Sequence, residues 1–272
     1  CVSFGVGAQG SPKLGIDFAT AESVIKGAFT NWISVDCGGA FPSLNMQSFG
    51  AIFCNHVEAN EQAANANAWI FRDDAWPYAP EGGFDGTYAL SCTTFDITTG
   101  QIYDVDVEIN SFGSQITVGD VNVGADLASI VTHEAGHFLG LEHSSVVGAT
   151  MAPAYQLGDT SLRSLEPDDA AGLCGLYPPV RQAEPNPSCL PRQGFSRDCQ
   201  STGVAGAAGA DAGSGGANSG TGGADAGVTP EPKESKGHGC SCRVPSSDAP
   251  RPVGVASAAL LIACLLRRRR RA

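Results

Sequence analysis

Three histidines at fixed spacing are the residues of this chain best suited to chemistry. His133 and His137 are four residues apart, so on a helix their imidazoles share one face and can reach one small ion. Gly140 follows where a helix can end at positive φ, and the chain can then turn back and bring His143 in as a third nitrogen. Three imidazoles leave one position of a tetrahedral zinc open for water, as in catalytic sites. Glu134 is then the expected general base that takes a proton from this water.

The alternative is a helix that carries three surface histidines. The chain has only five histidines in 272 residues, and three of them fall at these offsets. The extended pattern HExxHxxGxxH is far more specific than HExxH alone, so the sequence favours a zinc site.

This motif resembles that of the metzincin metalloproteases, which also have a methionine-containing turn beneath the zinc. Met151 is one of only two methionines and lies eight residues after His143, in the sequence Ala-Thr-Met-Ala-Pro. Ser144 directly after the third histidine, the Met-x-Pro turn and the run 165–177 resemble the matrixin branch. The resemblance covers roughly residues 1–180. It implies a zinc-dependent endopeptidase with an α+β zincin fold, in which a mixed twisted sheet is combined with an active-site helix and a C-terminal helix.

The resemblance also implies a pocket for the substrate side chain that follows the cut bond. Pro153, Ala154 and Tyr155 come directly after the Met-turn and are expected to wall this pocket. Tyr155 could instead donate to the oxyanion, as a tyrosine does in other metzincin branches. Its offset from Met151 does not match those branches, so the wall role is favoured.

Further metal sites are weaker hypotheses. His56 could be a second metal ligand, but it has no partner histidine at a suitable spacing, so a loop histidine is favoured. Calcium is expected by analogy only. Asp73, Asp74 and Asp85 flank a loop where such a site is conceivable, although solvated turn residues are the favoured interpretation.

The elements that must position these residues can be read from hydrophobic spacing. Residues 19–35 carry apolar side chains at helical spacing, and Thr20 and Ser23 offer N-cap oxygens. Asp126 is a good N-cap for the helix that carries the first two histidines, and Asp168 and Asp169 favour the start of a last helix. Strands are expected at residues 2–6, 46–54, 68–72, 87–95 and 101–110.

The segment 101–110 alternates between apolar and acidic residues, which predicts one buried face and one acidic face. It resembles the edge strand of bacterial matrixin-like proteases, and the resemblance implies that it pairs with an extended substrate. The acidic face could equally serve only to keep an exposed edge from aggregating.

Charge and cysteine content restrict the class of protein. The net charge is −12 even though five arginines are clustered at the C-terminal end, which argues against nucleic-acid binding. Ten cysteines indicate an oxidising, extracytoplasmic location. Cys37 with Cys54 and Cys189 with Cys199 close short loops and are the preferred pairs, while the connectivity of the others is left open. Cys1 could be a lipidation site, although a disulfide is favoured, and the absence of a leader suggests a removed secretory signal.

Composition divides the chain into four parts. Residues 1–180 form the protease-like domain, and 181–200 a cysteine-containing appendage. Residues 201–239 are rich in Gly, Ala and Ser, cannot build a core and are expected to be a flexible spacer. Residues 240–272 contain two cysteines, a short apolar segment at 253–266 and the arginine cluster. This tail resembles the sorting signals of myxobacterial surface proteins, which implies processing and display at the cell surface. A simple membrane anchor is the alternative.

The function predicted from sequence is hydrolysis of peptide bonds in extracellular proteins. The rival is a surface binding or adhesion module on a zincin scaffold without turnover. Glu134 favours the enzyme, because a binding module has no need of a general base. A peptidase with narrow, self-directed specificity is a further possibility. The natural substrate and the oligomeric state are not encoded in any visible pattern.

Overall fold

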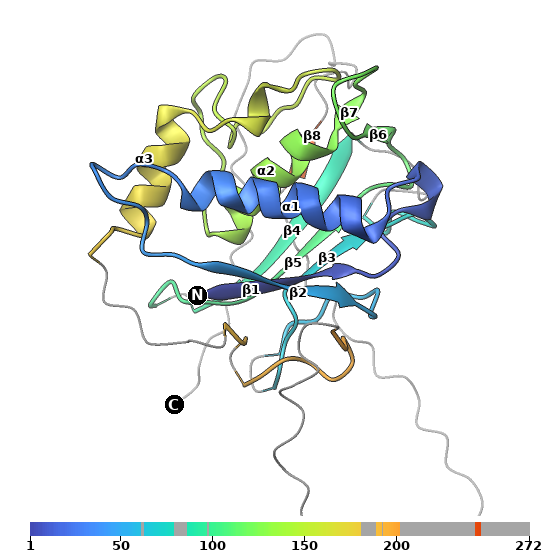
Figure 1. The fold of residues 1–272 in the computed structure, drawn as a ribbon, viewed down its shortest axis with the longest axis horizontal. Helices are drawn as coiled ribbons and strands as arrows, with labels where there is room; N and C mark the ends of the chain where they lie inside the picture. The colour runs from blue at the N-terminus through green and yellow to red at the C-terminus, as the bar shows by residue number, and fades with distance from the viewer. Residues whose placement is uncertain are drawn as a thin grey trace, which may run out of the picture.

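A six-stranded mixed sheet is the framework of the protein. The computed structural model describes residues 1–60, 63–78, 86–96, 98–180, 189–191, 193–201 and 243–245. The strand order is β2-β1-β3-β5-β4-β8, and two long helices cross one face of this sheet (Figure 1). The first four strands in this order are parallel, whereas β4 is antiparallel to β5 and to β8. The strands are β1 (Val2–Gly7), β2 (Met46–Ile52), β3 (Ala68–Phe71), β4 (Thr87–Phe95), β5 (Ile102–Ile109) and β8 (Arg243–Pro245).

Three α-helices complete the α+β architecture expected from sequence. They are α1 (Phe18–Ile33), α2 (Leu127–Phe138) and α3 (Pro167–Leu176). Asp17 caps α1 by accepting a hydrogen bond from the Thr20 backbone at 2.8 Å, in place of the expected cap from Thr20 or Ser23. The smaller elements are η1 (Pro12–Leu14), β6 (Ile116–Thr117), β7 (Ala125–Asp126) and η3 (Ser161–Arg163).

Aromatic side chains fill the space between the sheet and the two long helices. Phe29 of α1 lies between Phe138 of α2 and Phe4 of β1, with ring centroids 5.1 and 4.9 Å away, and Trp69 of β3 packs against both Phe29 and Phe138. The Trp32 indole donates to the Thr132 carbonyl at 2.8 Å. Large aromatic rings contribute much of the apolar area that this core removes from water, and they fix α2 against the sheet.

The position of β5 corrects the expectation that residues 101–110 form an edge strand. β5 lies between β3 and β4, so no substrate can pair with it. Its acidic side chains Asp104, Asp106 and Glu108 are also buried rather than exposed. Arg72 forms an ion pair with Glu108, and Asp106 accepts backbone hydrogen bonds from Ala68 and Glu58, both at 2.8 Å. The alternation predicts the two faces of the strand correctly, but loops cover the acidic face as well.

The disulfides also differ from the expected short loops. Cys1 is bonded to Cys189, Cys37 to Cys174, and Cys54 to Cys199, so the two predicted pairs are wrong. Cys92 is disulfide-bonded too. The prediction paired cysteines that are close in sequence because they close short loops, whereas the fold brings cysteines of distant segments together. The appendage is therefore tied to the outer face of the sheet, where Cys54 and Cys199 share a small apolar cluster with Ile52, Ala66, Ala68 and Ile70.

The spacer at 201–239 and the apolar segment at 253–266 lie outside the described part of the chain, apart from Ser201. Within the described ranges, no helix is long and apolar enough to cross a membrane.

Candidate active site

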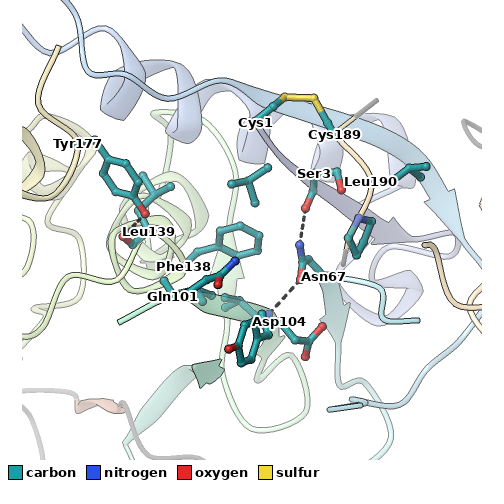
Figure 2. A pocket seen from close by; sticks show the side chains of 15 residues that line it. Cys1, Ser3, Asn67, Gln101, Asp104, Phe138, Leu139, Tyr177, Cys189 and Leu190 are labelled. Atoms are coloured by element: carbon teal, nitrogen blue, oxygen red, sulfur yellow. Dashed lines mark hydrogen bonds between the residues drawn. A yellow bond between two sulfur atoms is a disulfide. The ribbon is translucent and has the colours of Figure 1, made fainter. Parts of the chain in front are cut away.

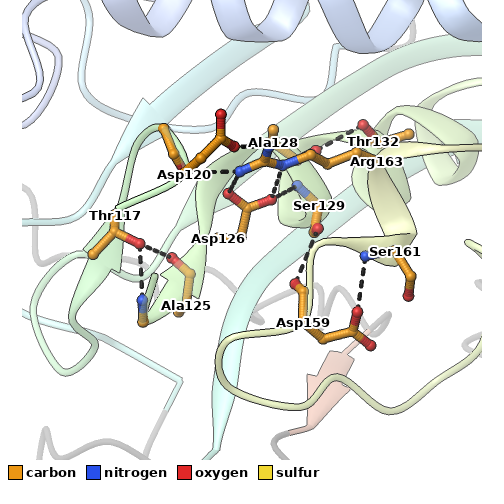
Figure 3. Close-up of polar contacts among 12 residues, drawn as sticks. Thr117, Asp120, Ala125, Asp126, Ala128, Ser129, Thr132, Asp159, Ser161 and Arg163 are labelled. Atoms are coloured by element: carbon orange, nitrogen blue, oxygen red, sulfur yellow. Dashed lines mark hydrogen bonds and ion pairs between the residues drawn. The ribbon is translucent and has the colours of Figure 1, made fainter. Parts of the chain in front are cut away.

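The N-terminus of α2 is anchored firmly. Asp126 caps the helix by accepting from the Ser129 backbone at 2.8 Å, as the sequence predicts. The Arg163 guanidinium donates to both carboxylate oxygens of Asp126 at 2.7 Å and to the Gly119 carbonyl at 2.8 Å (Figure 3). Burial raises the pKa of Asp126, but hydrogen bonds from Arg163 and Ser129 outweigh it and hold the pKa below its usual value. This ion pair links the loop around η3 to the start of the helix.

The three predicted histidines converge on one point. Their candidate ligand atoms all lie within 4.8 Å of one another. The ring centroids are 4.7 Å apart for His133 and His137, 5.2 Å for His133 and His143, and 4.8 Å for His137 and His143. Gly140 has φ of 90° and ends the helical segment, as its position in the motif predicts. The spacing therefore produces the convergence expected from sequence.

The hydrogen bonds of the rings leave one nitrogen of each helix histidine free for a metal. His133 Nδ1 lies 2.6 Å from the Thr150 carbonyl, and His137 Nδ1 lies 2.8 Å from the Leu141 carbonyl. A carbonyl only accepts, so each Nδ1 carries the proton and each Nε2 presents a lone pair.

The two Nε2 atoms are 3.0 Å apart. Two lone pairs facing each other at this distance repel unless a cation lies between them. In a tetrahedral zinc site with Zn–N bonds of about 2.05 Å, ligand nitrogens are roughly 3.3 Å apart. The donor set therefore fits zinc.

The pKa values of all three histidines are lowered, which keeps the imidazoles neutral. Burial is the main cause for each ring. For His137, burial and the charge of His143 lower the pKa to about 3. Neutral imidazole is the form that binds metal, so the site is prepared for an ion at neutral pH.

Glu134 is fully buried beside these rings. Its Oε2 accepts a hydrogen bond of 2.6 Å from the Ser91 hydroxyl of β4. Its Oε1 has no hydrogen-bond partner among the described residues. Burial raises the pKa of Glu134 to about 8, although the hydrogen bond from Ser91 lowers it. Without a metal, this burial favours the protonated acid. A divalent cation held by the three histidines would lower the pKa again and leave a carboxylate whose free Oε1 can accept a proton.

The Met-turn lies under the histidines and is held by α3. Asp169 accepts backbone hydrogen bonds from Thr150 at 2.8 Å and from Met151 at 3.0 Å, and the Met151 carbonyl accepts from the Ser144 backbone at 2.8 Å. Met151 is buried, and its thioether packs against Gly136 of α2. The Thr150 carbonyl in this turn also holds His133, so the turn orients a histidine directly.

The three expected pocket residues differ in exposure. Pro153 and Ala154 are exposed, whereas Tyr155 is buried. The Tyr155 hydroxyl accepts from the Asp126 backbone and donates to the Asp159 carbonyl, both at 2.8 Å. Its ring packs edge-on against Tyr88. The hydroxyl thus connects the segment after the Met-turn to the start of α2.

The weaker metal hypotheses find no support among the described residues. The three histidines form the one group of potential metal ligands there, and His56 is an exposed loop residue. Asp73 instead accepts hydrogen bonds from the Ser11 hydroxyl at 2.6 Å and the Lys13 backbone at 2.9 Å, and also from the Ser111 hydroxyl. Asp85 lies outside the described residues.

A separate pocket of about 240 Å³ lies at the opposite end of α2 from its cap (Figure 2). Phe138, Leu139, Tyr177 and the Cys1–Cys189 disulfide contribute to its walls, and none of the three histidines does. It therefore does not belong to the histidine site.

Sequence reasoning missed three residues at the site: Ser91, Gly136 and the second role of Asp169. Asp169 was assigned to helix capping, which is correct because it accepts from the Glu166 backbone at 2.9 Å, but it also holds the Met-turn. The position of Gly136 between the two helix histidines is a signal for close packing against that face. Nothing in the sequence around Ser91 distinguishes it from other serines in strands.

Comparison with known proteins agrees with this geometry. The Matrixin family model matches residues 12–178. Matrix metalloproteinase-25 of Mus musculus is 36% identical over 132 residues, which cover 46% of this chain and 19% of that protein. Stromelysin-3 of Xenopus laevis is 34% identical over 105 residues, or 39% of this chain and 21% of that protein. Matrix metalloproteinase-16 of Homo sapiens is 36% identical over 122 residues, which cover 44% of this chain and 19% of that protein. The chain thus aligns with about a fifth of the length of these curated relatives.

Proposed function

Because this chain belongs to the matrixin family, we propose that it is a zinc-dependent endopeptidase that hydrolyses peptide bonds in proteins outside the cell. The observation that carries the proposal is the convergence of three histidine nitrogens within 4.8 Å of one another, next to a buried carboxylate. Fold alone does not give function, so the chemistry of these side chains is decisive.

His133, His137 and His143 would hold zinc in this proposal. Bound there, zinc would act as a Lewis acid toward the peptide carbonyl and lower the pKa of its water to about 7. The Thr150 and Leu141 carbonyls fix the orientation of the two helix histidines, so these rings need no reordering to bind. Glu134 accepts the proton of the attacking water on Oε1 and then delivers it to the leaving amine.

The position of β4 supports peptide binding along this strand. Ser91 of β4 touches Glu134, so an extended chain added to the outer side of β4 passes close to the general base. β8 already pairs with this side as an antiparallel strand, opposite Thr87 and Leu90. The backbone of β4 thus pairs with an added strand on this side, and a substrate peptide would take the place of β8 there, which is a common mode of peptide recognition. Protein and peptide substrates are the partners that we propose.

Pro153 and Ala154 are proposed to wall the pocket for the side chain after the cut bond, because both are exposed directly after the Met-turn. Tyr155 supports this wall from behind, through its hydrogen bonds to Asp126 and Asp159. Calcium enters the proposal by family analogy alone.

The proposed location is the cell surface. The disulfides of the described residues suit an oxidising compartment. The tail at 240–272 is proposed to be a sorting signal that is removed, although its apolar segment lies outside the described residues. Detecting the mature chain on intact cells, with its C-terminus determined by mass spectrometry, tests this location.

Cleavage of casein and of a peptide library by the zinc-loaded protein tests the activity, with zinc content measured alongside. Hydrolysis should stop when a chelator removes the metal and return when zinc is restored. The Glu134→Gln variant should keep one zinc and lose activity by about 10³-fold, within the range of general-base effects. Full activity in that variant would refute the mechanism. Zinc binding without any cleavage would instead favour the surface binding module.

A further inference from the structure

Ser91 is the side chain through which the sheet touches the catalytic carboxylate. It lies on β4, it is buried, and its hydroxyl donates to Glu134 Oε2 at 2.6 Å. The histidine motif does not include this strand, and Ser91 is 43 residues away from Glu134 in sequence. The contact therefore adds a residue from a different element to the active site.

The hydrogen bond leaves the two oxygens of Glu134 in different situations. Oε2 is occupied by Ser91, whereas Oε1 is buried without a partner among the described residues. A glutamate side chain has three rotatable bonds, and one fixed oxygen removes most of its freedom to turn. The carboxylate is then held with Oε1 available to the water that attacks the substrate.

We propose that Ser91 is a positioning residue, which fixes Glu134 from strand β4 so that one carboxylate oxygen stays directed at the reacting water. This inference rests on the proposed peptidase function and deepens it. When Glu134 takes the proton on Oε1, Oε2 becomes the carbonyl oxygen of the acid and still accepts from the Ser91 hydroxyl. The same contact thus serves before and after proton transfer, and no proton leaves Ser91.

The effect expected from this role is on kcat rather than on KM. A small displacement of a catalytic group reduces the rate of the chemical step, whereas substrate contacts elsewhere are unchanged. Ser91→Ala should lower kcat by about tenfold or more, on the scale of misplaced catalytic groups, with KM within twofold of the wild type.

The sharpest comparison is between Ser91→Thr and Ser91→Val, because these side chains have nearly the same shape and differ in the hydroxyl. The threonine variant should retain most of kcat, and the valine variant should match the alanine variant. Should the alanine variant fail to fold, the threonine and valine variants still test whether the hydroxyl positions Glu134. Ser23→Ala is the control, since Ser23 is an exposed serine of α1 outside the site.

Two measurements distinguish positioning from a structural role. Zinc content per chain should be equal in all variants. Affinity for a peptide hydroxamate, whose N–H and O–H groups are expected to donate to Glu134, should fall about tenfold in the valine variant and stay unchanged in the threonine variant and the Ser23→Ala control.

Equal kcat in the threonine and valine variants overturns the proposal, as does a loss confined to KM or a parallel loss of zinc. In those cases the wild type still cleaves peptides in a chelator-sensitive manner, and only the role of Ser91 is lost. A wild type that binds no zinc and cleaves no peptide would refute the peptidase function, and the role of Ser91 with it.

Discussion

Gly136 of α2 is in direct contact with Met151 of the turn beneath it. A Cβ at position 136 would overlap the Met151 thioether and would lie 2.8 Å from the Trp32 ring. The absence of a side chain between the two helix histidines is therefore what allows the Met-turn to approach the helix. The turn in turn supplies the Thr150 carbonyl that orients His133.

Gly136→Ala should accordingly destabilise the protein by about 1–3 kcal/mol, the usual cost of overpacking a core, and weaken zinc binding. Urea unfolding and a zinc-competition titration measure the two effects. Gly27→Ala is the matched control, because Gly27 is an exposed residue of α1 with no atom within 4 Å of an added Cβ. That change should stabilise the helix by about 0.5–1 kcal/mol. Equal stability of the two variants would contradict the packing argument.

Asp169 and Asp168 are neighbours with very different expected contributions. Asp169→Ala leaves the backbone N–H groups of Thr150 and Met151 without an acceptor and should cost about 3 kcal/mol. Asp168 is exposed and, among the described residues, accepts one hydrogen bond, from the Ser144 hydroxyl, so Asp168→Ala should cost about 0.5 kcal/mol. Thermal unfolding of the two variants compares these values. If both variants lose the same stability, Asp169 does not hold the Met-turn.

Zinc should stay bound in mildly acidic solution. The pKa values of the three histidines are lowered, so protons compete with the metal only when the pH falls well below the usual histidine value. We expect full zinc content at pH 5.5 after dialysis, measured by atomic emission, with the urea-unfolded chain as the control that releases its metal. Half-loss of zinc between pH 7 and 6 would mean that the rings titrate normally.

Asp104 should make stability depend on pH. Burial, together with the charges of Asp106 and Glu58, raises the pKa of Asp104 well above its usual value. Above about pH 4, where a free aspartate ionises, the folded state holds a proton that the unfolded chain releases. The free energy of unfolding of the wild type therefore falls as the pH rises above this value. Asp104→Asn removes the proton exchange. The free energy of unfolding of this variant, minus that of the wild type, should therefore increase between pH 4 and pH 8.

Urea unfolding at several pH values measures this trend. Asp96→Asn provides the comparison, because Asp96 is only half-buried and backbone hydrogen bonds from Thr99 and Thr98 lower its pKa. Its effect should be nearly constant between pH 4 and pH 8, because a lowered pKa changes stability only below about pH 4, where the free aspartate ionises. A difference between Asp104→Asn and the wild type that is constant over this range would show that Asp104 is ionised in the folded protein.

The sequence predicted those features that depend on local spacing. The histidine offsets, the Asp126 cap and the break at Gly140 all follow from helix geometry, and each is present. The features that were predicted wrongly depend on contacts between distant segments. The burial of both faces of β5 requires the cover supplied by other loops, and the cysteine pairs join residues 137–188 positions apart.

Ser91 illustrates the same limit at the site itself. Its partner Glu134 is on another element, and only the packing of α2 against β4 brings the two side chains together. Asp169 was recognised as a helix-capping residue, yet its contact with the Met-turn depends on how α3 packs beneath that turn. Local patterns thus identify the reacting groups, and the tertiary fold decides which residues hold them.

The Cys37–Cys174 bond joins the segment after α1 to α3, the helix whose Asp169 holds the Met-turn. A crosslink over such a long loop contributes about 5 kcal/mol in the chain-entropy view. The redox state of the surroundings is thereby coupled to the histidine cluster, although no sulfur atom is among its ligands. Protein made in a reducing cytoplasm would lack this disulfide. Dithiothreitol would weaken the packing of α3 and the Met-turn under the histidines without removing any metal ligand.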